Sequence, residues 1–318
     1  MSISTDPSRG AADVPAAASP SGAPLVPGPR RPPQAVVRRA RRRRSRILVN
    51  LAAVVVFVCS VFPVYWMVST SFLPNGLIRR PDPTFAPTSP TTGNYHQVLF
   101  EESQFPFFDA LRNSLAVTVL TVIAALILAL LAALAVTRFR FRSRRAFIVT
   151  ILIVQMLPGE AMIISIYRLL DGWQLTNSIL GLTMVYVATV LPFTIWTLRG
   201  FVVGVPIELE EAAMIDGCSR TRAFFTITFP LMAPGLIATG VFAFIQAWNE
   251  FVTALVLMNR PEHITLPVWL RSFKQVNSGT DWGAIMAGST LMTIPVIVFF
   301  LFVQGRMTTG LVSGAVKG

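Results

Sequence analysis

Charged side chains are scarce in this sequence. Asp, Glu, Lys and Arg together make 13% of the 318 residues, whereas hydrophobic residues make 53%. A soluble domain usually carries about 25% charged residues. The composition therefore excludes an ordinary soluble domain, and the mean hydropathy of +0.62 favours a chain whose solvent is lipid.

Lysine, histidine and cysteine are also rare. The only lysines are Lys274 and Lys317, and neither follows a glycine. The phosphate-binding loop GxxxxGK[ST] of an ATPase is therefore absent. The two histidines have no metal-ligand spacing around them, so no metal and no cofactor is predicted. Cys59 and Cys218 provide no disulfide framework.

The excess positive charge lies in clusters beside apolar runs. The net charge is +12, and nine of the 27 Lys and Arg residues lie between Arg30 and Arg46. They end a Pro-, Ala- and Ser-rich segment, residues 1–46, which has too few large apolar residues to fold. We expect this segment to be a disordered cytoplasmic tail that contacts membrane lipid and no nucleic acid.

Six apolar segments are long enough to cross a membrane as helices, which takes about 20 residues. The first is about 26 residues long, which is too long for a signal peptide. Prolines within or near these segments are expected to kink or end helices locally. The six segments are Ile47–Phe72, Ala110–Val136, Ala146–Leu169, Ser178–Val203, Leu231–Met258 and Gly283–Val303.

Arginines collect on one side of these segments. The tail, the loop Arg138–Arg145 with its five arginines, and the loop holding Arg220 and Arg222 all fall on that side. Positive residues in short loops stay in the cytoplasm. The sequence therefore predicts an all-α integral membrane protein of the cell membrane, with six transmembrane helices and both termini in the cytoplasm.

The most polar internal stretch, residues 204–230, joins the fourth and fifth segments. Pro206 and the glutamates after it favour the start of a helix. Gly217 suits a left-handed helix end, and Ser219 can cap a second short helix that ends at Pro230. Two short helices joined by a glycine turn are predicted. Their length and exposed phenylalanines favour a docking surface over a plain connector.

This loop carries a recognisable signature. The order E-A-A-x-x-x-G, nine residues, I-x-x-P resembles the motif of permease subunits of ATP-binding-cassette (ABC) importers, with Phe229 where leucine is usual. Over about residues 47–318 the chain is similar to the second permease of maltose-type sugar systems. Stretches that carry this likeness are FPVYWMVSTSF (62–72), AWNEF (247–251) and TDWGAIMAGS (280–289).

The resemblance implies a non-catalytic subunit that forms half of a translocation pathway for a sugar. Its partners would be a second permease, two ATP-binding subunits and an extracytoplasmic solute-binding protein. The chain would divide into a first helix with its outer loop (47–106), a permease core (107–306) and a cytoplasmic tail (307–318). Residues implied to couple the loop to the ATPase are Glu211, Ala212, Ala213, Asp216, Gly217, Ile227 and Pro230.

The outer loop Asn259–Trp282 is implied to reach toward the solute-binding protein. Its central polar residues are the contact candidates, and its charges are mixed in sign. These candidates are Lys274, Gln275 and Asn277.

Polar residues inside the apolar segments are the candidates for the substrate pathway, because charges within the bilayer usually face a cavity or a bundle interior. Gln246 and Glu250 would share one helix face, with Asn249 beside them. Gln155 is a weaker candidate. The alternative for Glu250 is a structural contact with the partner permease or an anchor at the level of the lipid headgroups, and Glu160 is expected to pair with backbone N–H groups freed by the preceding proline.

Other functions stay open on the residues alone. The solute of an ABC permease can be something other than a sugar. A stand-alone secondary transporter would show repeat symmetry, and none is evident. A membrane enzyme would need a cluster of catalytic groups, which two loop histidines and scattered carboxylates do not supply.

Overall fold

The computed structural model describes residues 34–82, 85–86, 89–100, 106–275 and 279–315. The chain divides into two units, residues 1–60 and 61–318. In the first unit, the described part is the amino-terminal portion of helix α1 (Gln34–Ser71). The second unit is almost entirely helical within its described residues, and its two short strands, β1 (Lys274–Gln275) and β2 (Gly279–Thr280), form an antiparallel hairpin.

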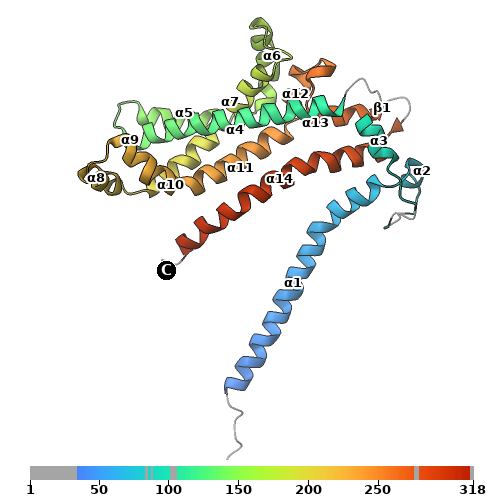
Figure 1. Cartoon of the computed structure of the whole chain (residues 1–318), viewed down its shortest axis with the longest axis horizontal. Helices are drawn as coiled ribbons and strands as arrows, with labels where there is room; N and C mark the ends of the chain where they lie inside the picture. The colour runs from blue at the N-terminus through green and yellow to red at the C-terminus, as the bar shows by residue number, and fades with distance from the viewer. Residues whose placement is uncertain (1–33, 83–84, 87–88, 101–105, 276–278, 316–318) are drawn as a thin grey trace, which may run out of the picture. The chain divides into compact units, whose positions relative to one another are not determined.

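Four long helices build the second unit together with shorter helical pieces (Figure 1). The long helices are α4 (Phe107–Arg138), α7 (Ile179–Gly204), α11 (Ala233–Asn249) and α14 (Trp282–Ala315). The shorter α-helices are α2 (Asn75–Ile78), α3 (Gly93–Phe100), α5 (Arg144–Gln155), α6 (Ile163–Gly172), α8 (Ile207–Ile215), α9 (Arg220–Ala223), α10 (Phe229–Leu231), α12 (Val252–Leu257) and α13 (Leu266–Leu270). Single turns of other helix types are η1 (Gly159–Met162), η2 (Phe224–Thr228), η3 (Pro261–His263) and η4 (Arg271–Phe273).

Helices α4, α7 and α11 form the centre of the second unit, with α4 packed along α7 and α11 packed against both. Ala125, Ala129 and Ala133 are fully buried at a spacing of four, which places them on one stripe of α4. Small residues let membrane helices approach closely where lipid supplies no hydrophobic drive. This stripe therefore explains the tight packing of the central helices.

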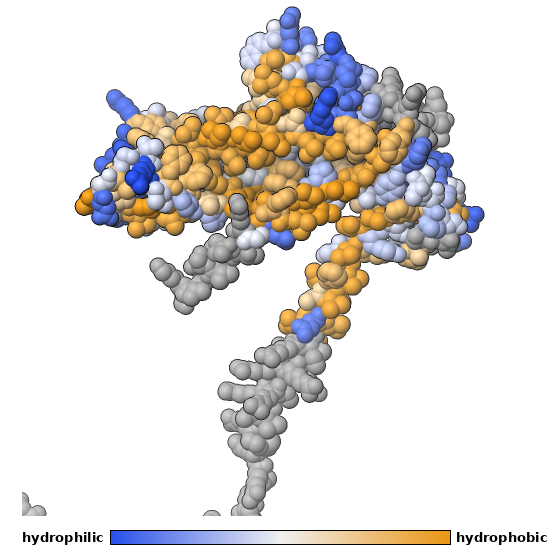
Figure 2. Space-filling model, in the orientation of Figure 1, coloured by the Kyte–Doolittle hydropathy of each residue, from blue (hydrophilic) through white to orange (hydrophobic). Residues whose placement is uncertain are grey.

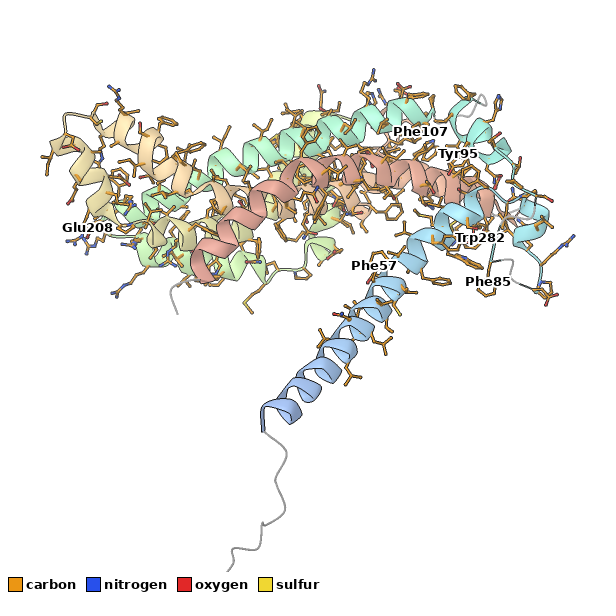
Figure 3. The ribbon with its side chains drawn as sticks, turned by 60° about the horizontal axis from the view of Figure 1, so that its bottom comes forward. Phe57, Phe85, Tyr95, Phe107, Glu208 and Trp282 are labelled. Carbon is orange, nitrogen blue, oxygen red and sulfur yellow. The ribbon has the colours of Figure 1, made fainter. Side chains whose placement is uncertain are left out.

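The loop between α12 and α14 is hydrogen-bonded to the first turns of α4. The Asn113 side chain donates hydrogen bonds to the carbonyls of Glu262 and Ile264, at 2.9 and 3.1 Å. Leu266 N donates to Ser114 Oγ at 2.7 Å. Figure 3 shows Phe107 and Tyr95 at this end of the second unit, and Glu208 of α8 at the other end.

The exposed face of the central helices is apolar. Figure 2 shows hydrophobic side chains covering the surface over α4 and α11. Because apolar side chains at this density would be costly in water, this face suits contact with lipid or with other membrane helices. Exposed apolar side chains of α4 include Val119, Leu120, Ile123, Ile127, Leu128 and Leu131.

Four described helical stretches are long and apolar enough to span a membrane, namely Leu48–Ser71 of α1, α4, α7 and Trp282–Gly305 of α14. The number rises to six if each of two bent pairs is one span. The predicted third segment, Ala146–Leu169, is wrong as one continuous helix. It covers most of α5 and most of the helical stretch Gly159–Gly172, which meet at a bend of 87°. Pro158 stands at the break in an extended conformation, so the local helix end expected of a proline here divides the segment.

The predicted fifth segment, Leu231–Met258, also differs from the structure. Helix α11 ends at Asn249, Glu250 adopts an extended conformation, and α12 begins at Val252. At its other end α11 follows the helical stretch Arg220–Leu231 at a bend of 65°. The segment is therefore interrupted rather than one straight span.

The two ends of the chain are more helical than predicted. Helix α1 begins at Gln34, within the segment expected to be disordered, because this part is rich in the helix formers Ala and Arg. Residues 1–33 of that segment lie outside the described residues. Helix α14 continues to Ala315, beyond Val303, where the predicted sixth apolar segment ends.

Candidate functional site

The loop 204–230 folds into two short helices around a glycine turn, as predicted. Helix α8 ends at Ile215, and Gly217 follows with a φ of +89°. Gly217 N donates to the carbonyl of Met214, and Cys218 N donates to that of Ala213. These two bonds form a Schellman motif, which needs a left-handed residue after the helix. The turn therefore depends on glycine at position 217.

The second half of the loop begins as expected and ends differently. Ser219 Oγ accepts a hydrogen bond from Arg222 N, so it caps α9 as predicted. The prediction that this helix stops at Pro230 is wrong, because helical structure continues to Leu231 through the π-helix η2. Proline has no N–H to donate to the preceding turn, and the wider π turn accommodates that missing bond.

The residues implied to couple with an ATPase lie mostly on the exposed side of this loop. Glu211, Ala212, Asp216, Gly217 and Pro230 are exposed, whereas two others are partly buried. The two partly buried residues are Ala213 and Ile227.

Ile215 is a residue of this surface that sequence reasoning missed. Its side chain is 86% exposed at the last position of α8, next to the glycine turn. The available signal was its place between the E-A-A sequence and Gly217, at the tip of the predicted loop.

The opposite side of the loop is held by an ion pair that sequence reasoning also missed. Arg138 Nη2 lies 3.1 Å from Glu210 Oε1, and each side chain is 12% exposed. The sequence suggested only that Arg138 marks the cytoplasmic side and that Glu210 favours a helix start. No local pattern joins two residues 72 positions apart.

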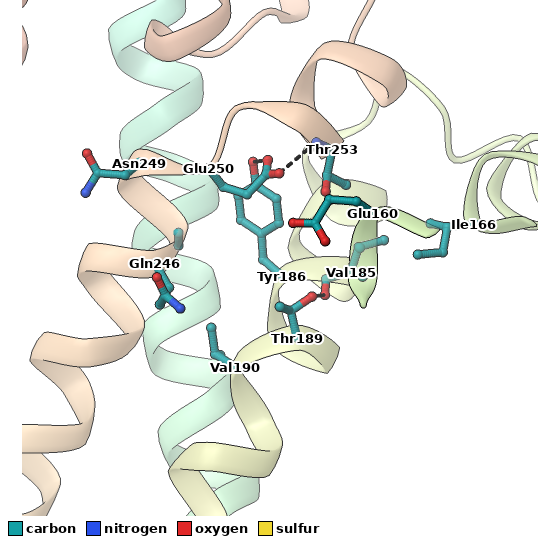
Figure 4. Close-up of a pocket in the computed structure, with 12 residues that line it drawn as sticks. Glu160, Ile166, Val185, Tyr186, Thr189, Val190, Gln246, Asn249, Glu250 and Thr253 are labelled. Atoms are coloured by element: carbon teal, nitrogen blue, oxygen red, sulfur yellow. Dashed lines mark hydrogen bonds between the residues drawn. The ribbon is translucent and has the colours of Figure 1, made fainter. Parts of the chain in front are cut away.

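A cavity of about 260 Å³ lies between α7, the α11–α12 break and the start of η1. Figure 4 shows Glu160 beside Tyr186 and Glu250, with Gln246 and Asn249 projecting from α11. Two carboxylates and several amide and hydroxyl groups line this cavity, with no Lys, Arg or His among its described lining residues. The lining residues are Gly159, Glu160, Ile166, Val185, Tyr186, Thr189, Val190, Gln246, Ala247, Asn249, Glu250 and Thr253.

Glu250 is satisfied by the protein itself. Its Oε2 accepts hydrogen bonds from the Tyr186 hydroxyl at 2.6 Å and from Ala254 N at 3.0 Å. Its Oε1 accepts from Thr253 N at 2.7 Å. The expected shared helix face of Gln246 and Glu250 is wrong, because Glu250 lies outside α11, yet both residues line the cavity. These bonds give Glu250 a structural role within the chain.

The remaining polar candidates are divided between the cavity and the surface. Gln246 and Asn249 are exposed in the cavity, whereas Gln155 is exposed outside it at the end of α5. Glu160 was expected to pair with backbone N–H groups. Instead its carboxylate accepts no hydrogen bond within the described part of the chain, and it lines the cavity. Glu160 is thus a cavity residue that sequence reasoning had assigned to structure.

The hairpin of β1 and β2 carries part of the set of residues predicted to contact the solute-binding protein. Lys274 is exposed in β1, next to Gln275, and Asn277 lies outside the described residues. Asp281, directly after the hairpin, accepts hydrogen bonds from the side chains of Asn75 and Gln97, at 2.7 and 3.0 Å. These bonds fix the base of the hairpin to α2 and α3.

No group of three or more His, Cys, Asp or Glu side chains that could hold a metal occurs among the described residues. Both cysteines are free.

Two named relatives resemble this chain along most of its length. The diacetylchitobiose uptake system permease protein DasC of Streptomyces coelicolor is 45% identical, over 86% of this chain and 98% of the relative. The trehalose/maltose transport system permease protein MalG of Thermococcus litoralis is 34% identical, over 86% of this chain and 98% of the relative.

A solved structure shares the fold. A bacterial ABC transporter that imports the acidic polysaccharide alginate matches with a TM-score of 0.69 and 23% identity, over 82% of this chain and 96% of that chain.

The sequence profile of the family "Binding-protein-dependent transport system inner membrane component" matches residues 125–311. The chain therefore belongs to the inner membrane components of binding-protein-dependent transport systems.

Proposed function

We propose that this chain is a permease subunit of an ABC sugar importer, in which it forms half of the translocation pathway. The observation that carries the proposal is the loop around Gly217. Most of its motif residues are exposed, and they lie around a glycine turn at one end of the helical bundle. The sugar relatives DasC and MalG support the substrate class. The subunit itself performs no catalysis.

Coupling to ATP hydrolysis would occur at the exposed side of the loop. Glu211, Asp216 and Ile215 present two charges and one apolar side chain to a partner. A motor subunit that closes on ATP could move α8 only through contacts that differ between its two states. The partner set is one further permease, two ATP-binding subunits and an extracytoplasmic solute-binding protein, which the hairpin at Lys274 would approach.

In the membrane, the chain would cross six times, with each bent helix pair counted as one span and both termini in the cytoplasm. The arginine-rich loop Arg138–Arg145 and the loop at Gly217 then share the cytoplasmic side, in agreement with the positive-inside rule. The hairpin and α3 lie on the outer side. The polar residues that line the cavity would then lie between the cytoplasmic side and the outer side.

The cavity at Gln246 and Asn249 would be part of the pathway. Its lining offers amide and hydroxyl groups that can hydrogen-bond sugar hydroxyls. Because it contains two carboxylates and no described cation, an anionic sugar would be disfavoured there. The proposed substrate class is therefore an uncharged oligosaccharide, such as the diacetylchitobiose, trehalose or maltose of the relatives' names.

Co-purification tests this function. The affinity-tagged chain, extracted from its native membrane in mild detergent, is expected to bring down a second permease and a nucleotide-binding subunit, both identified by mass spectrometry. Ile215→Glu should lose the nucleotide-binding subunit and keep the second permease, because the added charge lies on the exposed tip of α8.

The matched control is Ile215→Val, which keeps an apolar tip and should retain both partners. If the unaltered chain brings down no nucleotide-binding subunit, the proposed function is wrong.

A further inference from the structure

A single carboxylate oxygen connects three elements at the base of the loop. Glu210 Oε1 lies 3.1 Å from Arg138 Nη2 and accepts a hydrogen bond from Thr228 Oγ1 at 2.7 Å. Arg138 Nη2 also donates to the Val205 carbonyl at 2.9 Å. The last residue of α4, the first turn of α8 and the π-helix η2 therefore meet at one point, beside the junction of α7 with α8. We call these four residues the loop clamp.

The loop clamp is largely buried, so Arg138 and Glu210 each need the opposite charge of the other in place of water. Arg138 and Glu210 are each 12% exposed, and Thr228 is fully buried. Arg138 Nε has no hydrogen-bond partner within the described residues. A buried pair of this kind is a poor source of net stability compared with apolar residues of the same size, and its best-attested use is to fix one arrangement. The clamp is therefore better explained by positioning than by stability.

A second contact joins the other half of the loop to the same end of α4. The guanidinium of Arg220, the first residue of α9, lies 5.6 Å from the centre of the Phe139 ring. Phe139 directly follows Arg138. The helices on both sides of the Gly217 turn thus contact the carboxy-terminal end of α4.

The backbone links that join the loop to α7 and to α11 would transmit force poorly without such contacts. Val205 and Pro206 are both extended, so α7 and α8 are joined by a short non-helical link. At the other end, the stretch before Met232 meets α11 at a bend of 65°. A force applied at Ile215 could be absorbed by bending at either joint.

We propose that the Arg138–Glu210 pair is the positioning link through which movement of α8 is delivered to α4, and from α4 to its packing partners α7 and α11. This inference rests on the proposed coupling role of the loop. Neither residue needs to touch an ATP-binding subunit. They make the base of the loop rigid, so that displacement of the exposed tip moves the bundle instead of bending the joints.

The test compares uptake with ATP hydrolysis in the complete importer, reconstituted in proteoliposomes with its solute-binding protein and radiolabelled diacetylchitobiose, trehalose or maltose. Arg138→Met with Glu210→Leu removes both buried charges together, so the fold should persist. We expect the melting temperature and subunit composition to match those of the unaltered complex. Sugar transported per ATP hydrolysed should fall at least tenfold.

Two single substitutions and a control test which property of the Arg138–Glu210 pair matters. Glu210→Gln keeps the acceptor for Thr228 but removes the charge facing Arg138, and it should show the same uncoupling. Arg138→Lys keeps a cation beside Glu210, so it should retain part of the sugar transported per ATP hydrolysed. The control is Asp109→Asn, which breaks the exposed Arg112–Asp109 pair at the other end of α4 and should change neither activity.

Unchanged sugar per ATP in the folded double variant would overturn the proposal. Parallel loss of ATP hydrolysis, uptake and thermal stability in every clamp variant would also overturn it, because that pattern belongs to a purely structural pair. Failure of the proposed function is recognised separately, by the absence of a nucleotide-binding subunit from the unaltered complex.

Discussion

Gly217→Val is expected to reduce ATP-driven uptake at least tenfold while the chain still inserts and binds its partner permease. Apart from its two chain neighbours, no described residue has an atom within 4 Å of the place that a Cβ would occupy, so the effect does not come from a clash. It comes from the backbone, because a φ of +89° is costly for any residue with a Cβ and most costly for a β-branched one. Valine would force the turn open.

Opening the turn breaks the Schellman bonds that follow α8. Gly217 N and Cys218 N would lose their carbonyl partners Met214 and Ala213, and α8 would change direction relative to α9. The measurement is uptake in cells together with the amount of chain in the membrane fraction. Gly217→Asn is the matched control, since asparagine tolerates positive φ better than other residues. Normal uptake by Gly217→Val would show that this turn has no role in coupling.

Glu250→Ala is expected to destabilise the part of the bundle around the cavity by about 3 kcal/mol, because it leaves three donors without their acceptor. They are the Tyr186 hydroxyl and the backbone N–H groups of Thr253 and Ala254. Each unsatisfied buried group costs about 1–3 kcal/mol. The adjoining cavity can admit water, so we expect the total near the lower end of the sum.

The measurement is thermal unfolding of the purified complex, with uptake as a second readout. The carboxylate fixes the break between α11 and α12 and so the position of Gln246 and Asn249, which should make transport fall with stability. Glu262→Ala, in an exposed position of the outer loop, is the control and should unfold like the unaltered protein. Equal stability of Glu250→Ala would show that its hydrogen bonds are not structural.

Local chemistry made the conformation of the loop 204–230 predictable from the sequence. A proline, a run of glutamates, a glycine and a serine at the right spacing define helix starts and ends without help from the rest of the fold. Gly217 and Ser219 therefore end and begin helices as predicted, and the four unbroken apolar stretches in α1, α4, α7 and α14 follow from hydropathy in the same way. Only the end of the second short helix, at Leu231 rather than Pro230, departs from this pattern.

The clamp and the cavity depend on contacts between distant parts of the chain. Arg138 and Glu210 meet because the end of α4 lies beside the start of α8, which neither residue's neighbours in the sequence indicate. Glu250 interrupts an apolar run that hydropathy alone reads as continuous, since the break is stabilised by Tyr186 from another helix. Glu160 likewise reaches the cavity only because the chain bends by 87° beside Pro158.

The most direct measurement is ATP-dependent uptake by the purified complex in proteoliposomes, with the solute-binding protein and one of the radiolabelled disaccharides outside. A permease subunit that is coupled through the loop at Gly217 predicts accumulation that requires ATP, the binding protein and the unaltered glycine. Accumulation by this chain alone, without a nucleotide-binding subunit, would instead indicate a stand-alone transporter and contradict the account.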